Sequence, residues 1–212
     1  MPEVILGEGK SLEHLVGLLE GLHARGRGAL VSRPTRRHVD ALRRAARAGL
    51  PIHFEAGGRI ARLAGPIAEG VAPGTVAVVT AGTADVPTAE EAISVLRAVG
   101  VRAVTSFDVG VAGIHRLERA LRRLERHRPA AYLVFAGREG ALPTVVAGLV
   151  RAPVIGIPTS VGYGRGGRGE AALLAMLQSC APVAVVNIDA AVPAALFAIQ
   201  LLAAAHRRPR PR

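Results

Sequence analysis

Cysteine, lysine and aromatic residues are scarce in this chain. It contains one cysteine, Cys180, one lysine, Lys10, and no tryptophan, and aromatic residues make up 3% of the sequence. A single cysteine cannot form an internal disulfide, so nothing points to an oxidising compartment. Few aromatic side chains are available to stack on bases, and the chain has no nucleic-acid-binding motif with stacking residues.

A long uninterrupted hydrophobic run is also lacking. The longest apolar stretch, 183–205, is broken by Asn187, Asp189 and Pro193. The part that follows Pro193 is shorter than the roughly 20 residues that a membrane span needs. The N-terminal sequence MPEVILGEGK lacks the basic-then-apolar order of a signal peptide. We therefore expect a soluble cytoplasmic protein with no membrane partner.

The net charge is +11, and almost all of the basic residues are arginines. Such a balance favours an anionic partner, including nucleic acid. In RLERALRRLERHR, residues 116–128, Leu117, Leu121 and Leu124 nevertheless share one helical stripe, and the arginines occupy the other faces. That pattern is typical of a solvated helix. We therefore disfavour nucleic acid as the partner.

Half of the residues are hydrophobic, and 25 glycines and 14 prolines indicate many tight turns between strands and helices. From Thr75 onward, apolar runs alternate with helical segments. The runs are VAVVT (76–80), VRAVTSF (101–107), AYLVFA (131–136), PVIGIPT (153–159) and VAVVNI (183–188). Continuous apolar runs indicate strands covered on both faces, as in a parallel sheet. The pattern predicts an α/β protein with a flavodoxin-like, doubly wound parallel sheet.

Three segments follow from these patterns. Residues 1–70 are predicted to form a small N-terminal α/β lobe, with an Arg-rich helix over 35–48 and two short strands around Gly57 and Gly58. Residues 75–206 are predicted to form the doubly wound domain, joined to the lobe by the Pro- and Gly-rich linker 65–74. Residues 207–212 are predicted to be a basic disordered tail.

Helix starts in the second segment are also predictable. Thr88 and Glu91, just after Pro87, match a capping box, in which each side chain bonds the backbone N–H of the other residue. Gly100 closes the same helix. We therefore predict a helix that begins at Thr88.

Unusual polar residues follow each predicted strand. In an open parallel sheet, ligands bind beyond the carboxyl ends of the strands. Each such residue also has a structural explanation: Asp85 and Asp108 are candidate helix caps, His115 a surface residue, and Glu139 the start of the next helix. Their convergence on one edge nevertheless favours a site. The candidate nucleotide- and phosphate-binding residues are Thr83, Asp85, Asp108, His115, Arg116, Gly137 and Tyr163.

Cys180 precedes the fifth predicted strand, so it is expected at the opposite, amino edge of the sheet. Free cysteines are most often small buried hydrophobic residues. A position near a helix C-terminus also disfavours a thiolate. If Cys180 reacts, a nearby cation must lower its pKa, and the thiol must meet the polar edge of another subunit. Catalysis by Cys180 is therefore tied to oligomerisation.

Several segments resemble the LarB family of pyridinium-3,5-biscarboxylic acid mononucleotide synthases. They are TAGTADVPTAEEA, FDVGVAGIHR, AGREGALPTVVAGLV, PVIGIPTSVGYG and GEAALLAMLQSCAPVAVVNID. The start PEVILGEGK resembles the family's N-terminal region, so the resemblance covers nearly the whole chain. Residues 75–203 also resemble, more distantly, the PurE carboxylases of purine biosynthesis. The resemblance thus implies a PurE-like catalytic domain.

The resemblance to the LarB family implies a reaction. Nicotinic acid adenine dinucleotide is carboxylated at C5 of its pyridinium, with CO₂ as co-substrate, and its phosphoanhydride is cleaved to release AMP. Cys180 is the implied nucleophile and Glu139 the candidate acid or base. Either arginines or a divalent ion such as Mg²⁺ would neutralise the phosphates, and Asp85 and Asp108 are candidates to bind the ion or to position the attacking water. The substrate would be a small-molecule dinucleotide, and we expect a homo-oligomer whose active sites are shared between subunits.

One departure from the family pattern lies after Asp189. The family usually continues with Asn and a Gly-rich turn, whereas this chain has Ala190, Ala191 and Pro193. One wall of the pocket is therefore expected to differ. Two alternatives stay open: a PurE-type aminoimidazole ribonucleotide carboxylase or mutase, and a non-catalytic nucleotide- or nucleic-acid-binding module. The module predicts that Cys180→Ala has no effect and that affinity for polynucleotide depends strongly on salt.

Overall fold

The computed structural model describes residues 2–68 and 70–206. The chain divides into two units, Met1–Val71 and Ala72–Arg212. Their boundary lies inside the Pro- and Gly-rich stretch 65–74, and each unit has its own sheet. The basic tail predicted for residues 207–212 lies outside the described residues.

The N-terminal unit is a four-stranded sheet with two helices. Its elements are β1 (Val4–Leu6), α1 (Leu12–Ala24), β2 (Ala29–Ser32), α2 (Arg36–Arg47), β3 (Ile52–Glu55), the 3₁₀ turn η1 (Ala56–Gly58) and β4 (Ile60–Leu63). The strand order is β1-β2-β4-β3, in which only β1 and β2 are parallel. Leu15, Leu19 and Leu42 from the helices pack with buried residues of the strands in one core.

The predicted Arg-rich helix is confirmed as α2. Thr35 is its N-cap: its hydroxyl accepts a hydrogen bond from the backbone N–H of His38 at 3.3 Å. The His38 Nδ1 accepts one in return from the backbone N–H of Thr35 at 3.1 Å. Both donors would otherwise lack partners in the first helical turn, so the pair fixes the start of the helix.

The C-terminal unit alternates strands and helices. Its elements are β5 (Thr75–Thr80), η2 (Thr83–Asp85), α3 (Val86–Ala98), β6 (Arg102–Ser106), η3 (Val111–Gly113), α4 (Ile114–Glu125), β7 (Ala131–Ala136), α5 (Leu142–Leu149), β8 (Val154–Pro158), α6 (Glu170–Leu177), β9 (Val183–Val185) and α7 (Ala191–His206). All strand pairs are parallel, in the order β6-β5-β7-β8-β9. Numbered within the sheet, this order is 2-1-3-4-5, which is the flavodoxin-like topology. The predicted fold class is therefore confirmed.

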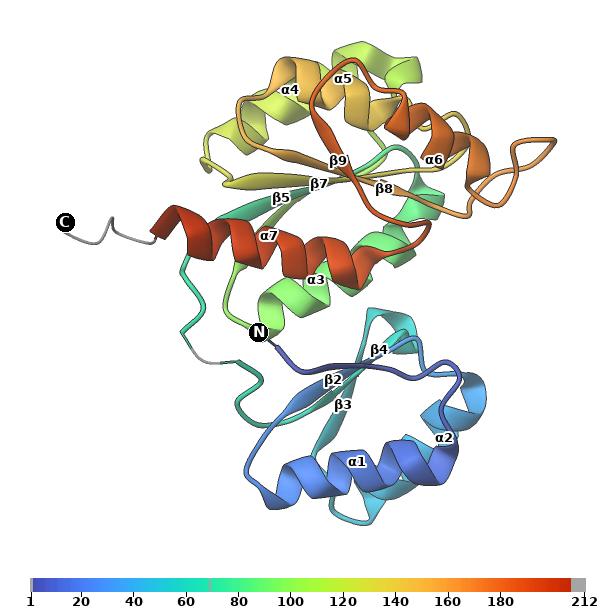
Figure 1. The fold of residues 1–212 in the computed structure, drawn as a ribbon, viewed down its shortest axis with the longest axis vertical. Helices are drawn as coiled ribbons and strands as arrows, with labels where there is room; N and C mark the ends of the chain where they lie inside the picture. The colour runs from blue at the N-terminus through green and yellow to red at the C-terminus, as the bar shows by residue number, and fades with distance from the viewer. Residues whose placement is uncertain (1, 69, 207–212) are drawn as a thin grey trace. The chain divides into compact units, whose positions relative to one another are not determined.

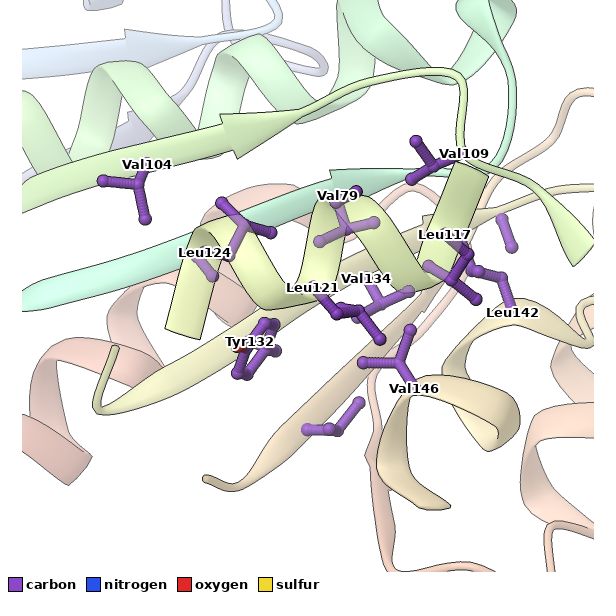
Figure 2. Packing of buried hydrophobic residues seen from close by; sticks show 14 of the residues in the cluster. Val79, Val104, Val109, Leu117, Leu121, Leu124, Tyr132, Val134, Leu142 and Val146 are labelled. Atoms are coloured by element: carbon purple, nitrogen blue, oxygen red, sulfur yellow. The ribbon is translucent and has the colours of Figure 1, made fainter. Parts of the chain in front are cut away.

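Helices cover both faces of this sheet. Helices α3 and α7 pack on each other and on one face, while α4 and α5 lie on the other (Figure 1). Leu117, Leu121 and Leu124 form the inner stripe of α4, as the sequence predicts, and pack over the strand residues Val79 and Val134 (Figure 2). The arginines of α4 are left on its outer faces. Among residues 2–68 and 70–206, no helix is long and apolar enough to cross a membrane.

The capping box predicted at Thr88 and Glu91 is wrong. Helix α3 already begins at Val86, with Pro87 in its first turn, so both residues lie inside the helix and are buried. Proline favours this position because its fixed backbone angle suits the first turn and its missing N–H is not needed there. The chain therefore enters the helix earlier than the sequence signal indicates.

The fifth predicted strand, 183–188, is also shorter and more exposed than expected. Strand β9 covers only Val183–Val185, at the edge of the sheet, and none of its residues is buried. The chain leaves the sheet after Val186, because Asp189 forms a turn with φ of 55° and its N–H donates to the carbonyl of Pro158 at 2.8 Å. The prediction that every strand is covered on both faces therefore fails for β9.

Candidate functional site

A cavity of about 510 Å³ lies at the carboxyl edge of the sheet in the C-terminal unit. Its walls come from the loops after β5, β6, β7 and β8. The lining residues are Ala81, Gly82, Thr83, Ala84, Asp85, Asp108, Gly110, Val111, Ala112, Ala136, Gly137, Arg138, Glu139, Ala141, Leu142 and Val161. After β5 the chain passes to α3 on one face of the sheet, and after β7 it passes to α5 on the other face. The two loops therefore diverge, and a crevice lies between them. Ligands of doubly wound proteins bind at this position.

Asp85 is a buried carboxyl in the cavity wall, with 3% of its surface exposed. Its Oδ1 accepts a hydrogen bond from the Thr159 hydroxyl at 2.5 Å, and its Oδ2 accepts one from the backbone N–H of Gly82 at 2.9 Å. Thr159 follows β8 and Asp85 follows β5, and β7 lies between these strands. The Asp85–Thr159 hydrogen bond therefore bridges the end of β7 and joins two walls of the cavity.

The environment of Asp85 acts on its pKa in two directions. Burial raises the pKa above the ordinary carboxyl value and outweighs the hydrogen bonds from Thr159, Gly82 and Gly137, which lower it. The negative charge of Asp189 adds to the increase. Both oxygens of Asp85 already have donors from the protein. These partners suit a residue that braces the loops better than one that contacts a phosphate.

Gly137 lies where the loops after β7 and β8 approach each other most closely. A Cβ at this position would lie 2.2 Å from the carbonyl oxygen of Val161 and 2.8 Å from the hydroxyl oxygen of Thr159. No side chain fits there without moving the backbone of the β8 loop. Glycine at 137 therefore allows the two loops to pack together, and its backbone N–H interacts with the Asp85 carboxyl.

Asp108 begins the wall that follows β6. Its backbone has φ of 56°, a left-handed conformation, and its N–H donates to the Thr80 hydroxyl at 3.1 Å. Its Oδ2 accepts a hydrogen bond from Arg116 Nη1 at 3.4 Å, and about half of each side chain is exposed. An ion pair this exposed contributes little to stability. The pair instead reduces the freedom of the Asp108 carboxylate at the cavity mouth.

Arg138 and Glu139 form the wall that follows β7, and both are exposed. The Arg138 N–H donates to the carbonyl of Val161 at 3.1 Å, and its guanidinium lies 4.9 Å from the centre of the Tyr163 ring. Arg138 has φ of 49°, which is uncommon for a residue with a long side chain. These contacts hold the start of the Gly-rich loop 161–169 against the cavity.

The structure brings together five of the candidate residues and leaves four outside. The lining residues Thr83, Asp85, Asp108, Gly137 and Glu139 share the cavity. Three others lie close to it without lining it. Arg116 pairs with Asp108, Tyr163 stacks on Arg138, and His115 is exposed in the first turn of α4. The fourth, Cys180, lies elsewhere.

Cys180 is exposed and lies between the end of α6 and the start of β9. Because all five strands of this sheet are parallel, that segment lies at the amino edge, opposite the cavity. The backbone beside it is fixed by the Ser179 hydroxyl, which donates to the carbonyl of Ala181 at 2.9 Å and accepts from its N–H at 3.1 Å. Within one chain the thiol and the cavity are therefore on opposite sides of the sheet.

Three residues important to the site's geometry are absent from the candidate set. Thr159 holds Asp85, Arg138 holds the loop after β8, and Asp189 accepts a hydrogen bond from the Ser160 N–H at 2.9 Å. Arg138 and Asp189 follow predicted strands, and Thr159 is the last residue of one, which is the signal that could have identified them. Their partners are far away in the sequence, so the contacts themselves leave no local pattern.

The donor set does not fit a resident metal ion. Within the part of the chain that the structure describes, no group of three or more His, Cys, Asp or Glu side chains is arranged to hold one. Of the two proposed ligands, Asp85 is occupied by Thr159 and Gly82, and Asp108 pairs with Arg116. We therefore assign no step of the chemistry to a metal.

Two family models match this chain. Residues 1–64 match the LarB/PurE-like N-terminal domain, and residues 75–211 match AIR carboxylase. The chain belongs to the LarB family. Within it, the AIR carboxylase match covers the unit that carries the cavity, which makes the LarB family a distant relative of PurE.

Several proteins of known sequence are similar to part of this LarB-family chain. An uncharacterized protein of Methanocaldococcus jannaschii is 52% identical over 126 residues, which are 59% of this chain and 48% of that protein. The chain thus spans about half the length of this relative. The N5-carboxyaminoimidazole ribonucleotide mutase of the same organism is 32% identical over 131 residues, or 60% of this chain and 78% of the mutase. The Pyrococcus horikoshii mutase is also 32% identical, over 60% of this chain and 71% of its own.

Two solved structures are similar to this LarB-family chain. The crystal structure of Treponema denticola PurE has a TM-score of 0.47 and 22% identity, over 63% of this chain and 90% of that one. A structure of a PurE2 variant from the same organism has a TM-score of 0.48 and 21% identity, over 63% and 91%.

Proposed function

We propose that this protein carboxylates the pyridinium ring of nicotinic acid adenine dinucleotide and cleaves its phosphoanhydride. The products are pyridinium-3,5-biscarboxylic acid mononucleotide and AMP. This reaction is the first step in the synthesis of a nickel-pincer nucleotide cofactor. The observation that carries the proposal is the pair of family matches on one chain, a LarB-type N-terminal domain followed by an AIR carboxylase domain. The LarB resemblance links this domain pair to pyridinium chemistry.

The proposed reaction needs a nucleophile because a pyridinium ring is too electron-poor to attack CO₂. Addition of the Cys180 thiolate to C4 converts the ring into an enamine-like species in which C5 carries electron density. C5 then attacks CO₂ and forms the new carbon–carbon bond. A base, for which Glu139 is the candidate, removes the C5 proton, and the thiolate leaves as the ring becomes aromatic again.

The charges that line the cavity suit a cationic ring. Two exposed carboxyl groups, from Asp108 and Glu139, line the cavity together with the Arg138 guanidinium, while the carboxyl of Asp85 is buried in the wall. A bound pyridinium cation would in turn favour the thiolate form of a cysteine brought next to it. A volume of about 510 Å³ lies within the range of small-molecule sites. These features support binding of the nicotinate end of the substrate in the cavity.

The position of Cys180 requires a second subunit in this proposal. Its own cavity lies across the sheet, so a thiol that acts in a cavity must come from a neighbouring copy. The proposed enzyme is therefore a homo-oligomer in which each site combines one copy's cavity with another copy's cysteine.

A PurE-type mutase is the second candidate, and the 32% identical mutases favour it. An aminoimidazole ribonucleotide is already an enamine, so that reaction needs no thiol. The PurE segment AGGAAHLPG contains a histidine, whereas the matching segment AGREGALPT of this chain has Ala141 and carries Glu139. The two candidates therefore differ in whether Cys180 is needed.

Incubation with nicotinic acid adenine dinucleotide and ¹⁴C-bicarbonate tests the proposal. We expect label in a mononucleotide as AMP appears, and loss of carboxylation in Cys180→Ser by at least about a hundredfold, because the nucleophile is removed. Gln178→Ala is the matched control, since Gln178 is an exposed neighbour in the same segment. It should retain full activity.

Full carboxylation by Cys180→Ser would overturn the thiol mechanism. Conversion of N5-carboxyaminoimidazole ribonucleotide by both the native protein and Cys180→Ser, without labelling of the dinucleotide product, would establish the mutase instead.

A further inference from the structure

We propose that the Arg138 guanidinium binds the carboxylate on the nicotinate ring of the substrate and so selects an acid over the corresponding amide. Arg138 follows β7 and lines the cavity. The ring and its carboxylate come from the proposed function, on which this inference rests. Arg138 is then the residue that favours nicotinic acid adenine dinucleotide over nicotinamide adenine dinucleotide.

The accessible charges of the cavity match a zwitterion. Among the lining residues in the described part of the chain, Arg138 is the single cation, and Asp108 and Glu139 are the exposed carboxylates. A ribosylated nicotinate ring carries a positive nitrogen and a negative carboxylate, so both signs find a partner. A ribosylated nicotinamide ring is only positive, and it leaves the guanidinium without an anion.

Stacking positions the Arg138 guanidinium and leaves its N–H donors available. Its central carbon lies 4.9 Å from the centre of the Tyr163 ring, and guanidinium groups stack on aromatic faces in this way. Within residues 2–68 and 70–206, no hydrogen bond or ion pair engages these donors. The Arg116 guanidinium, in contrast, pairs with Asp108. Arg138 therefore offers a planar fork of donors that suits a carboxylate.

The backbone at Arg138 is held in an uncommon conformation. Its φ of 49° is left-handed, and a long side chain rarely adopts such an angle. The N–H of Arg138 donates to the carbonyl of Val161 at 3.1 Å, which fixes this conformation. Strained backbone persists where the surrounding structure enforces it, and it is concentrated at functional sites.

The neighbour of Arg138 in the sequence is Glu139, the candidate base. In the proposed reaction Glu139 acts at C5 of the ring, while the carboxylate is attached to C3, and both carbons flank C4. A guanidinium that binds the carboxylate through two hydrogen bonds fixes the orientation of the ring as well as its position. Arg138 would thereby hold C5 in one place relative to Glu139.

The diphosphate of the dinucleotide is the competing anion for Arg138. Both dinucleotides carry the same diphosphate, so a contact with it would strengthen the binding of both by the same factor. A contact with the ring carboxylate would strengthen the binding of the acid alone. Comparison of the two dinucleotides therefore distinguishes the two contacts.

Equilibrium binding of the two dinucleotides to the full chain, measured by calorimetry, tests the assignment. The native protein should bind nicotinic acid adenine dinucleotide about tenfold to a hundredfold more tightly, because the amide cannot form the charge-assisted pair. Arg138→Met removes the charge and keeps a long side chain. It should abolish the preference by weakening the binding of the acid alone, and its unchanged affinity for the amide reports an intact fold.

Arg165→Met is the matched control, because Arg165 is an exposed arginine of the Gly-rich loop outside the cavity lining. It removes the same charge and should keep the preference. Tyr163 is a positioning residue in this proposal. Tyr163→Leu should reduce the preference because the guanidinium loses its support, whereas Tyr163→Phe, which keeps the ring, should retain it.

A native protein without preference for the acid, or a preference that Arg138→Met retains, would overturn the assignment. Equal weakening of both dinucleotides by Arg138→Met would also overturn it and would place Arg138 at the diphosphate. The proposed reaction is judged separately by label from ¹⁴C-bicarbonate. A preference lost in Arg138→Met, in a native protein that carboxylates neither dinucleotide, would keep the carboxylate site and reject the reaction.

Discussion

Strands β7 and β9 belong to the same sheet but differ in almost every physical respect. All residues of β7 are buried, and it pairs with β5 on one side and β8 on the other. Strand β9 is three residues long, has no buried residue and pairs only with β8 among the strands described. The centre of the sheet thus supplies stability and the cavity, whereas its β9 edge is exposed among the residues described.

Two leucine-to-alanine changes should separate these regions most clearly. Leu117 is fully buried on the inner face of α4, and Leu117→Ala should lower the free energy of unfolding by about 2–5 kcal/mol because it leaves a cavity in the core. Leu177 is 61% exposed, so Leu177→Ala should change the free energy of unfolding of the monomer by less than about 0.5 kcal/mol. Urea denaturation at low protein concentration measures both.

Protein concentration sharpens the same comparison. If α6 and β9 are covered by another copy, the melting temperature of the native protein should rise with concentration, and Leu177→Ala should weaken that rise. The effect of Leu117→Ala should be similar at all concentrations. A melting temperature of the native protein that does not depend on concentration would contradict a contact between copies at α6 and β9.

A smaller effect is expected at Asp85, in the central region. Its folded-state pKa is raised by burial, so its contribution to stability is fully present below the ordinary carboxyl pKa and is lost as pH rises through the raised value. Asp85→Asn should remove this pH-dependent loss, measured by urea denaturation from pH 3 to 8. Glu90→Gln, at an exposed carboxylate of α3, is the control and should keep the slope.

If the free energy of unfolding of Asp85→Asn depends on pH as that of the native protein does, burial does not destabilise the ionised Asp85 carboxylate. That result would contradict the raised pKa of Asp85.

Much of the fold could be predicted because apolar runs report burial directly. The runs 76–80 and 131–136 correspond to β5 and β7 within one residue, since both strands are buried on both faces. The end of β9 could not be predicted from Val183 to Ile188, which is apolar except for Asn187. What ends the strand is the hydrogen bond from the Asp189 N–H to Pro158, a contact with a distant residue.

In the candidate site, too, features with a local sequence signal could be predicted and contacts between distant residues could not. Gly137, Glu139 and Asp108 were identified because they follow strands, and they line the cavity. The partner of Asp85 is Thr159, 74 residues later in the chain, and no local pattern links the two. The start of α3 differs from the prediction for a local reason, because Pro87 occupies the first helical turn ahead of the capping signal at Thr88 and Glu91.

Co-expression of two inactive variants tests the shared site most directly. Cys180→Ser keeps the cavity and lacks the thiol, while Glu139→Gln keeps the thiol and lacks the candidate base. In mixed oligomers with shared sites, about one quarter of the sites should combine an intact cavity with an intact thiol. Carboxylation of nicotinic acid adenine dinucleotide should therefore return to about one quarter of the native rate, provided that subunits mix at random. Mixed oligomers that stay as inactive as each variant alone would contradict a site shared between copies.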